Sequence, residues 1–518
     1  MKKISIVAML ITGTLTLHGM SPSVTPADVQ LFKGSRTNNK NLIENALRRG
    51  AHINHKDQAG LTPLMLACQQ GFHDAVCTLL TMKADTNLRD RDGLTALHYA
   101  VKENDLASTQ LLIAHDADVN AEDGEGDTPL LLACKLDKRE IAETLVQHCD
   151  INHCPKKGTT VLNFACARGK YWWCEFLLNN KATHTLKTPA GLNALSVACT
   201  RFHDHIAQLL LDHGADKTQL DTHQRNLIMQ AMAFYERGCY SMVLFLISKG
   251  VPCDIPDDRG TTALHIACEN GDYPLVDLLL KHGADPLRAN PNGDMSLLIA
   301  VKHDHRPIVS RVLMLIIMQK DYSLTNALCI ACSKGSQGIA SVLIAHGAEV
   351  SSENEYGITP LMAACATEET SLMSWLLQEK AVQVNQVNKK GLQALHYACA
   401  IGKKNVVMLL LYYGADVNAD SVDKGFPLTL ACNEGHEHIV SELLEAGASP
   451  DKPDHRGLTP LMICCSKNYH HVADLLLKHG ALIDIVNQRD QTALCIAAQH
   501  GATQCVELLL NHGADHNA

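Results

Sequence analysis

Apolar residues along this chain recur with a period of 33 residues. Each period carries a Leu or Ile followed three residues later by Ala, or once by Cys, and polar residues dominate the segments between these pairs. The spacing is nearly constant, so we place short insertions and deletions in connecting loops. The leading residues are Leu64, Leu97, Leu130, Leu162, Leu195, Ile228, Leu264, Leu297, Leu328, Leu361, Leu395, Leu428, Leu461 and Leu494. Leu31 fits the same period and indicates a degenerate opening unit, which makes fifteen units.

Each period predicts two short helices joined by tight turns. In the first regular unit, Thr62 can cap a helix and Pro63 occupies the first helical position, where a missing N–H is tolerated. This helix is expected to end near Gly71, which suits a left-handed stop. A second helix then places Val76 and Leu79 on one face and closes on a Gly-Ala-Asp sequence in many units. One unit has too little apolar surface to fold alone, so the units are expected to stack into a solenoid.

The turn that opens the units resembles that of ankyrin repeats. The family's Thr-Pro-Leu-His turn is matched closely at residues 95–98, 262–265 and 394–396, and all but its last residue is matched at 62–64, 128–130, 359–361 and 459–461. The resemblance covers residues 25–518. It implies an all-α ankyrin-repeat solenoid of stacked helix-turn-helix units with loop or β-turn fingers, and a role in binding other proteins.

This reading divides the chain into three parts. Residues 1–20 are predicted to be a signal peptide, residues 21–56 a degenerate N-terminal capping repeat, and residues 57–518 fourteen repeats in one continuous array. The array departs from the pattern at 221–257, where the turn motif is lost and three residues are added, and at 320–331, where the turn is shortened. We expect a bend or a weak interface at these two places.

The N-terminus is typical of an export signal. Lys2 and Lys3 precede an apolar run over residues 4–17, which is too short to span a bilayer. No small-x-small cleavage site follows this run. The alternative is a disordered or packed stretch that is not a signal.

Twenty cysteines at first suggest a disulfide framework, but ten of them share one position in the repeat, directly after the core alanine. Neighbouring helices lie roughly 8–10 Å apart, whereas bridged cysteines need Cα atoms within about 7 Å, so we expect free thiols acting as small apolar fillers. Free thiols suit a reducing compartment. A bacterial protein that is exported and then acts inside another cell reconciles both features; the alternative is a cytoplasmic protein.

The composition indicates how the core is built and which classes of partner are disfavoured. Apolar residues make up 46% of the chain and aromatic residues only 4%, which favours thin layers of Leu, Ala, Ile, Val and Cys. The net charge is −10 and no dense basic block is present, which argues against nucleic acid. No segment beyond the N-terminus is long and apolar enough to be a stable membrane span.

Chemistry-bearing motifs are absent from the sequence. It holds no phosphate-cradling glycine loop, nucleophile elbow or metalloprotease helix, so we predict neither an enzyme nor a cofactor. The pairs His148-Cys149 and His153-Cys154 form the densest set of metal-ligand types. Adjacent pairs rarely converge to a tetrahedral site, so no metal is assigned. Histidines also gather at turns between helices, where a solvated turn is favoured over a pH-sensitive or metal-binding ridge.

The resemblance implies that recognition uses loop tips and the exposed ends of first helices. The loop-tip candidates are Arg91, Asp92, Lys156, Lys157, Arg259, Tyr356, Lys389, Lys390, His455 and Arg456. The first-helix candidates are Lys102, Glu103, Lys135, Arg168, Arg201, Glu269, Asn270 and Lys302. Trp172 on a second helix is either a contact anchor or a side chain shielded by a neighbouring unit, and tryptophan is enriched at binding hot spots.

The function that these features favour is a non-catalytic scaffold for a protein partner, with a host protein as the partner if the chain is exported from a bacterium. Because the loop tips are rich in Lys and Arg although the chain is acidic, we expect a partner with an acidic patch; the alternative is that these residues serve solubility. Self-association through the apolar second helix of the last unit, with Val506, Leu508, Leu509 and Leu510, is a second hypothesis.

Overall fold

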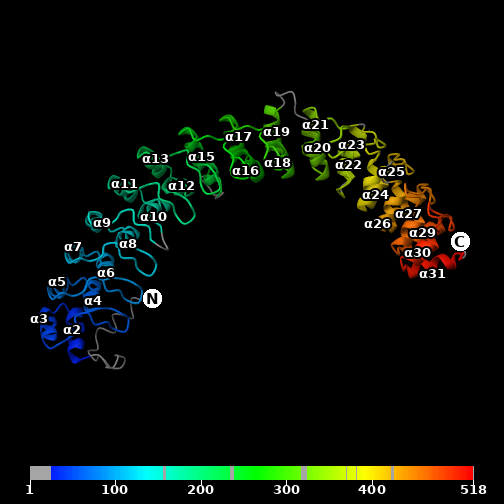
Figure 1. The fold of residues 1–518 in the computed structure, drawn as a ribbon. Helices are drawn as coiled ribbons and strands as arrows, with labels where there is room; N and C mark the ends of the chain where they lie inside the picture. Colours follow the sequence, from blue (N-terminus) through cyan, green and yellow to red (C-terminus); the bar gives the residue numbers. More distant parts are fainter. Residues whose placement is uncertain are drawn as a thin grey trace. The chain divides into compact units, whose positions relative to one another are not determined.

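A computed structural model describes residues 25–155, 159–233, 239–316, 324–368, 370–380, 382–421 and 425–516. The predicted signal peptide and two predicted contact residues, Lys156 and Lys157, lie outside these ranges. The chain divides into two units, Met1–Asp258 and Arg259–Ala518, and each is built from pairs of antiparallel helices (Figure 1).

In the first unit, the first helices of the pairs are α2 (Pro26–Arg36), α4 (Pro63–Gln69), α6 (Ala96–Lys102), α8 (Pro129–Leu136), α10 (Val161–Ala167), α12 (Ala194–Thr200) and α14 (Leu227–Met232). The second helices are α3 (Lys40–Arg48), α5 (His73–Thr81), α7 (Leu106–Ala114), α9 (Arg139–Leu145), α11 (Tyr171–Asn179), α13 (Asp204–Asp212) and α15 (Cys239–Ser248).

In the second unit, the first helices are α16 (Ala263–Asn270), α18 (Ser296–Lys302), α20 (Thr325–Ser333), α22 (Pro360–Ala364), α24 (Ala394–Ile401), α26 (Pro427–Glu434), α28 (Pro460–Ser466) and α30 (Ala493–Gln499). The second helices are α17 (Tyr273–Lys281), α19 (Arg306–Ile316), α21 (Gln337–Ala345), α23 (Thr370–Glu379), α25 (Lys404–Tyr412), α27 (Glu437–Glu445), α29 (His470–Lys478) and α31 (Thr503–Asn511).

The helix boundaries follow from local side-chain chemistry. Thr62 precedes α4 with an extended backbone, and its hydroxyl accepts a hydrogen bond from the Met65 N–H at 3.2 Å, which satisfies one of the free donors of the first turn. The helix ends just before Gly71, whose φ of +66° is a left-handed conformation that glycine adopts without steric cost. The predicted starts and stops of the helices are confirmed here.

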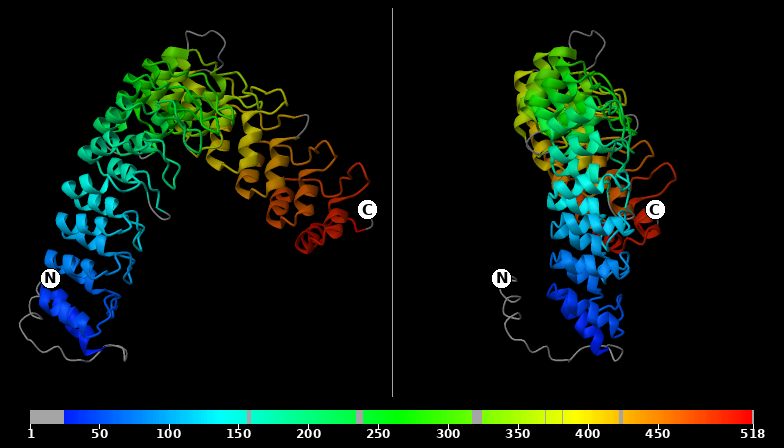
Figure 2. Two further views of the ribbon diagram at one scale, coloured as in Figure 1. Left: turned by 60° about the vertical axis from the view of Figure 1, so that its left-hand side comes forward. Right: turned by 90° about the vertical axis from the view of Figure 1, so that its left-hand side faces the viewer.

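Packing is between like helices of successive pairs. Within each unit, first helices contact first helices and most second helices contact second helices, as the side-by-side ribbons of Figure 2 show. The leading residue and the alanine of the period, such as Leu64 and Ala67, are almost fully buried between them. No strand occurs in the described ranges, where a single isolated bridge joins Ala289 and Met295. The all-α ankyrin-repeat solenoid is therefore confirmed.

Cysteine fills the core as expected. The ten cysteines at the shared position are all buried with free thiols, namely Cys68, Cys134, Cys166, Cys199, Cys268, Cys332, Cys365, Cys399, Cys432 and Cys465. Burial raises the pKa of the Cys199 thiol to about 12, and it also raises the pKa of the Cys268 and Cys365 thiols. Such groups stay protonated and apolar at neutral pH.

A ladder of side-chain hydrogen bonds links successive pairs, and the sequence analysis did not foresee it. The Asn87 side-chain oxygen accepts from the Asp118 backbone N–H at 2.7 Å, and its amide donates to the Asp116 carbonyl at 3.1 Å. The Asp N–H that follows the second helix, at the place where many units read Gly-Ala-Asp, is bound in this way by a residue of the preceding unit, namely Asn54, Asn87, Asn120 or Asn385. Each rung satisfies a backbone donor that would otherwise be left at the junction between pairs.

The stretch at 221–257 builds the standard turn without the standard motif. Asp221 accepts hydrogen bonds from the His223 and Arg225 N–H groups, both at 2.9 Å, and Asn226 caps α14 in place of threonine. At the second departure, α20 contacts both α18 and α22. The expected bend or weak interface stays a prediction at both places.

Candidate protein-binding surface

The connections that lead into the first helices form fingers, and most of those that the structure describes are organised around one Asp or Asn. In the second finger, one carboxylate oxygen of Asp90 accepts from the Asp92 N–H at 2.9 Å and the Leu94 N–H at 2.8 Å. This side chain closes the turn by mimicking a backbone hydrogen bond. The same geometry recurs at Asp57, Asp123, Asp221, Asn290, Asn354, Asn388, Asp454 and Asn487.

Neighbouring fingertips also touch through their backbones. The Arg91 N–H donates to the Ala59 carbonyl at 3.3 Å, and the Gly124 N–H donates to the Asp92 carbonyl at 2.7 Å. The backbones of Arg91 and Asp92 are thereby held while their side chains remain exposed. The fingers therefore present charged side chains from fixed positions, which lowers the entropy lost on binding.

Most predicted contact residues lie on the surface. Fifteen are exposed, namely Arg91, Asp92, Lys102, Glu103, Lys135, Arg168, Arg201, Arg259, Glu269, Asn270, Tyr356, Lys389, Lys390, His455 and Arg456. Two lysines at the ends of first helices are engaged by acidic residues of their own fingers. Lys302 forms an ion pair with Asp294 at 2.6 Å, and Lys135 forms one with Asp127. Exposure alone does not test binding, so these residues stay predictions.

Trp172 occupies a covered position on α11. The Arg139 guanidinium of the preceding pair lies 4.6 Å from the centre of its ring, and Phe176 stacks on it at 5.0 Å with the planes 6° apart. The neighbouring Trp173 is buried and donates to Asp137 at 2.6 Å. Trp172 thus takes the arrangement of the shielded alternative, and its role as a contact anchor stays a prediction.

A hollow of about 830 Å³ opens on the finger side of the second unit. It runs over α18, α20, α22 and α24 between the finger at residues 292–294 and the finger at residues 354–358. Its floor is apolar, from Leu298, Ile330, Met362, Ala363 and Ile401, and its rim carries Asn326, Asn354, Glu355 and Tyr356. Tyr356 is 66% exposed and Ile401 is 45% exposed, so both present apolar surface at the opening.

Two features of the sequence create this hollow. Only eight residues, 317–324, join α19 to α20, whereas fourteen, 282–295, join α17 to α18. The sequence therefore supplies six fewer residues for the connection that leads into α20 than for the connection that leads into α18. In addition, Ala363 stands at the position that Ile330 and Tyr397 occupy in adjacent repeats. Because the alanine side chain is smaller than either of these, the floor of the hollow is deeper at this repeat.

Comparison with known proteins assigns the family. The family described as "Ankyrin repeats (3 copies)" matches residues 31–123, 110–188, 228–326, 310–386, 328–421, 372–454 and 428–518. The chain belongs to the ankyrin-repeat family. Ankyrin repeats indicate a scaffold for protein–protein interaction.

Each of the curated relatives shares these repeats over only part of its length. Human Rabankyrin-5 is 28% identical over 258 residues, which cover 46% of this chain and 21% of that protein. The Caenorhabditis elegans ankyrin repeat and KH domain-containing protein mask-1 is 34% identical over 46% of this chain and 9% of its own length. The mouse B-cell lymphoma 3 protein homolog is 29% identical over 31% of this chain and 36% of its own length. The chain therefore matches only a minor part of each.

A solved structure is similar over part of the chain. The crystal structure of the ankyrin repeat domain of Bcl-3 covers 43% of this chain and 100% of that chain, with a TM-score of 0.39 and 23% sequence identity. Separately, the described helices include none with the length and apolarity that crossing a bilayer requires.

Sequence reasoning missed the hollow although one signal for it was present. The shortened turn at 320–331 was interpreted as a defect of stacking, whereas the structure places a surface feature beside it. The pairs at 148–149 and 153–154 do not come together as a metal site, and His153 instead binds the Glu122 carboxylate at 2.9 Å.

Proposed function

We propose that this ankyrin-repeat protein binds a protein partner on the finger side of its second unit, with the hollow between residues 292–294 and 354–358 as the anchoring point. The observation that carries the proposal is the combination of an apolar floor with a polar rim in a concave site, as in most sites that take a side chain from a partner. A regular row of fingers and large residues at the Ala363 position would fill this space.

The polar groups at the rim of the hollow indicate which kind of partner side chain it can accept. Asp294 neutralises Lys302, so the wall formed by this pair offers little net charge. Asn326 and Asn354, whose amides lie 3.4 Å apart, can donate to or accept from a peptide backbone. These features suit an apolar side chain on a loop or helix of the partner, with Tyr356 packing over it.

Blocking the hollow tests the proposal. The full chain is used as bait in crosslinking and mass spectrometry beside Ala363→Trp, which fills the floor, and Met314→Trp, which adds the same side chain at an exposed position of α19 outside the hollow. We expect Ala363→Trp to lose a partner that both the native chain and Met314→Trp retain. Retention of every partner by a folded Ala363→Trp would contradict the proposal.

Two finer features of the proposal rest on the sequence. Lys389 and Lys390 are exposed on a fingertip of the same unit, and they support a partner with an acidic patch. The charged and apolar start of the chain, together with the free thiols, supports a bacterial protein that is exported and acts on a host partner in a reducing compartment. The alternative location is the cytoplasm of the producing cell.

Self-association is the other class of function raised by the sequence. Leu510 on α31 is 47% exposed, and Val506 and Leu508 are half-buried. This small apolar face has no feature that identifies its partner, so the alternative stays a prediction.

A further inference from the structure

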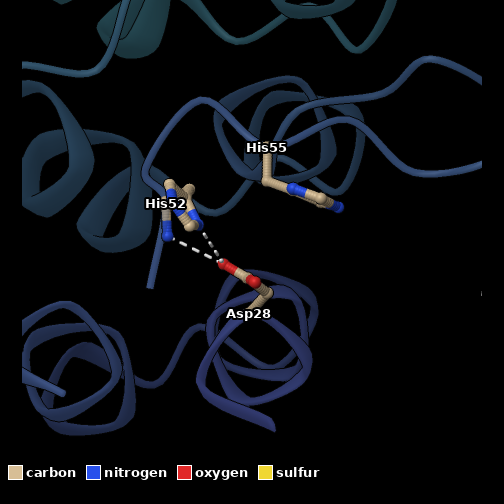
Figure 3. A group of neighbouring side chains, drawn as sticks. All are labelled: Asp28, His52 and His55. Carbon is tan, nitrogen blue, oxygen red and sulfur yellow. Dashed lines mark hydrogen bonds and ion pairs between the residues drawn. The ribbon is translucent and has the colours of Figure 1, made fainter. Parts of the chain in front are cut away.

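A cluster of metal-ligand side chains lies in the first repeat, far in sequence from the proposed binding hollow. Asp28 on α2 meets His52 and His55 from the connection after α3 (Figure 3). One carboxylate oxygen and one ring nitrogen from each histidine lie within 4.8 Å of one another. Among the described residues, no other three side chains of these types come this close.

The carboxylate of Asp28 is fixed before any ligand arrives. It is fully buried, and one of its oxygens accepts from the Thr25 N–H at 2.9 Å and the Thr25 hydroxyl at 2.7 Å. The other oxygen accepts from the His52 N–H at 2.7 Å. Burial alone would raise the pKa of Asp28, but hydrogen bonds from Thr25 and His52 hold it below its ordinary value, so the group is ionised at neutral pH.

His52 stands at the position that Asp85 takes in the next repeat, but its N–H has a different kind of partner. The Asp85 N–H is bound by Asn54 of the preceding repeat, whereas the His52 N–H is bound by the Asp28 carboxylate on α2 of the same repeat. The feature that distinguishes this place is the approach of two histidine rings to one buried carboxylate.

The geometry suits a metal ion. The Nδ1 atom of His52 lies 3.5 Å from the carboxylate oxygen of Asp28. Two donors on one tetrahedral zinc ion, each about 2.0–2.1 Å from the metal, are themselves separated by roughly 3.4 Å. These two atoms therefore stand at the separation that a shared ion requires.

His55 supplies the third donor. Its ring stands edge-on to Phe32, with centroids 6.1 Å apart, and it extends beside the carboxylate in Figure 3 instead of pointing straight at it. The half-buried side chain must move by an ångström or more to reach a common ion, which rotation about its side-chain bonds allows. The His52 side chain is 71% exposed, so its ring can also adjust toward a shared ion.

We propose that Asp28, His52 and His55 form a binding site for a divalent transition-metal ion of the zinc type. Two imidazoles and one carboxylate suit zinc, cobalt or nickel, whereas magnesium and calcium prefer oxygen donors only. Water takes the fourth position. The bound ion ties the connection after α3 to α2 and stabilises the first repeat, because it binds the folded chain in preference to the unfolded one.

Calorimetric titration of the full chain with zinc chloride tests the site. We expect one ion to bind, with at least about tenfold weaker affinity in His52→Ala and in His55→Ala. Asp28→Asn is the third variant, because it removes the charge of the ligand. Its single acceptor oxygen can keep the hydrogen bond from the His52 N–H but not also the one from the Thr25 N–H, so its fold is checked by circular dichroism. His148→Ala, in an exposed loop histidine outside the cluster, is the matched control and should bind as the native chain does.

Thiols are the competing ligands, since Cys77, Cys154 and Cys495 are exposed. Titration with cobalt(II) separates the two cases, because thiolate ligands give an intense charge-transfer absorption that nitrogen and oxygen ligands lack. Hydrogen exchange should slow at residues 49–56 on addition of zinc, in the native chain and not in His52→Ala. Absence of binding, binding that survives both histidine changes, or a cobalt spectrum dominated by sulfur would each overturn the proposal.

Discussion

Single side chains stabilise the junctions between repeats. His98, which the sequence analysis covered only as the last residue of a turn motif, is an example. Its Nδ1 accepts from the Thr95 N–H at 3.2 Å, and its Nε2–H therefore donates to the Asp127 carbonyl of the next finger at 3.0 Å. The ring is fully buried. A motif histidine thus joins two repeats in one neutral tautomer, which the pattern of letters alone does not disclose.

The buried His98 makes stability depend on pH in a defined direction. Burial lowers the pKa of this imidazole below its ordinary value of about 6.5. Above that pH the ring is neutral in both the folded and unfolded chain, and its contribution is complete. As the pH falls below 6.5, the unfolded chain takes up the proton first, so stability declines by at most about 1.4 kcal/mol per pH unit for this group.

Urea unfolding at pH 8, 7, 6 and 5.5 measures this effect. The variant His98→Leu introduces the residue that the next repeat has at the equivalent position, Leu131. Below pH 6.5 its unfolding midpoint should decline less steeply with falling pH than that of the native chain. An exposed histidine such as His148 provides the control, since His148→Leu should leave the slope unchanged. Equal slopes in the native chain and His98→Leu would refute the assignment.

Glycines at the end of the first helices show a second residue-scale device. Gly271 has φ of +75°, and a Cβ atom there would lie 2.5 Å from the His305 ring of the next pair. His305 in turn lies 3.1 Å through Nε2 from the Glu269 carbonyl. Three of the turn histidines, which the sequence suggested were solvated, lie against a glycine of the preceding repeat: His203, His305 and His436.

Gly271→Ala should lower stability by more than the backbone cost alone. The left-handed conformation costs alanine about 1 kcal/mol, and displacement of His305 adds to it, so we expect a loss of roughly 2 kcal/mol. Gly283→Ala is the matched control, with φ of +90° and open space around the added methyl group. Chemical denaturation gives the free energy of unfolding of both variants. Equal losses would show that the contact between Gly271 and His305 does not contribute to stability.

At the scale of elements, the sequence predicted most of what the structure contains. Helix pairs, caps and the buried cysteine position follow from a period repeated many times, so chance agreement at one unit is averaged out. The hollow and the Asp28 cluster could not be predicted in the same way. Each depends on one departure from the repeat, the short connection after α19 in one case and the histidines after α3 in the other. A periodic pattern locates such departures but does not say which side chains they bring together.

At the scale of the whole molecule, charge is distributed unevenly between the chain and its fingertips. The net charge is −10, yet Lys389 and Lys390 lie exposed together on one fingertip of the second unit. The Lys389 N–H donates to the Glu353 carboxylate at 3.1 Å, which fixes the backbone at the tip and leaves both ammonium groups to solvent. Exposed charges of this kind act mainly on the rate and salt dependence of association.

The double change Lys389→Glu and Lys390→Glu tests whether this tip contributes to binding. If the partner carries an acidic patch, the variant should bind it at least about tenfold more slowly at low salt, and the difference should shrink as salt is raised, because screening weakens interactions between exposed charges. Surface plasmon resonance at several salt concentrations supplies the association rates. The double change Lys478→Glu and Lys281→Glu, on two second helices, alters the net charge equally and controls for general repulsion. If both double variants slow association to the same extent, the fingertip has no specific role and its lysines serve solubility.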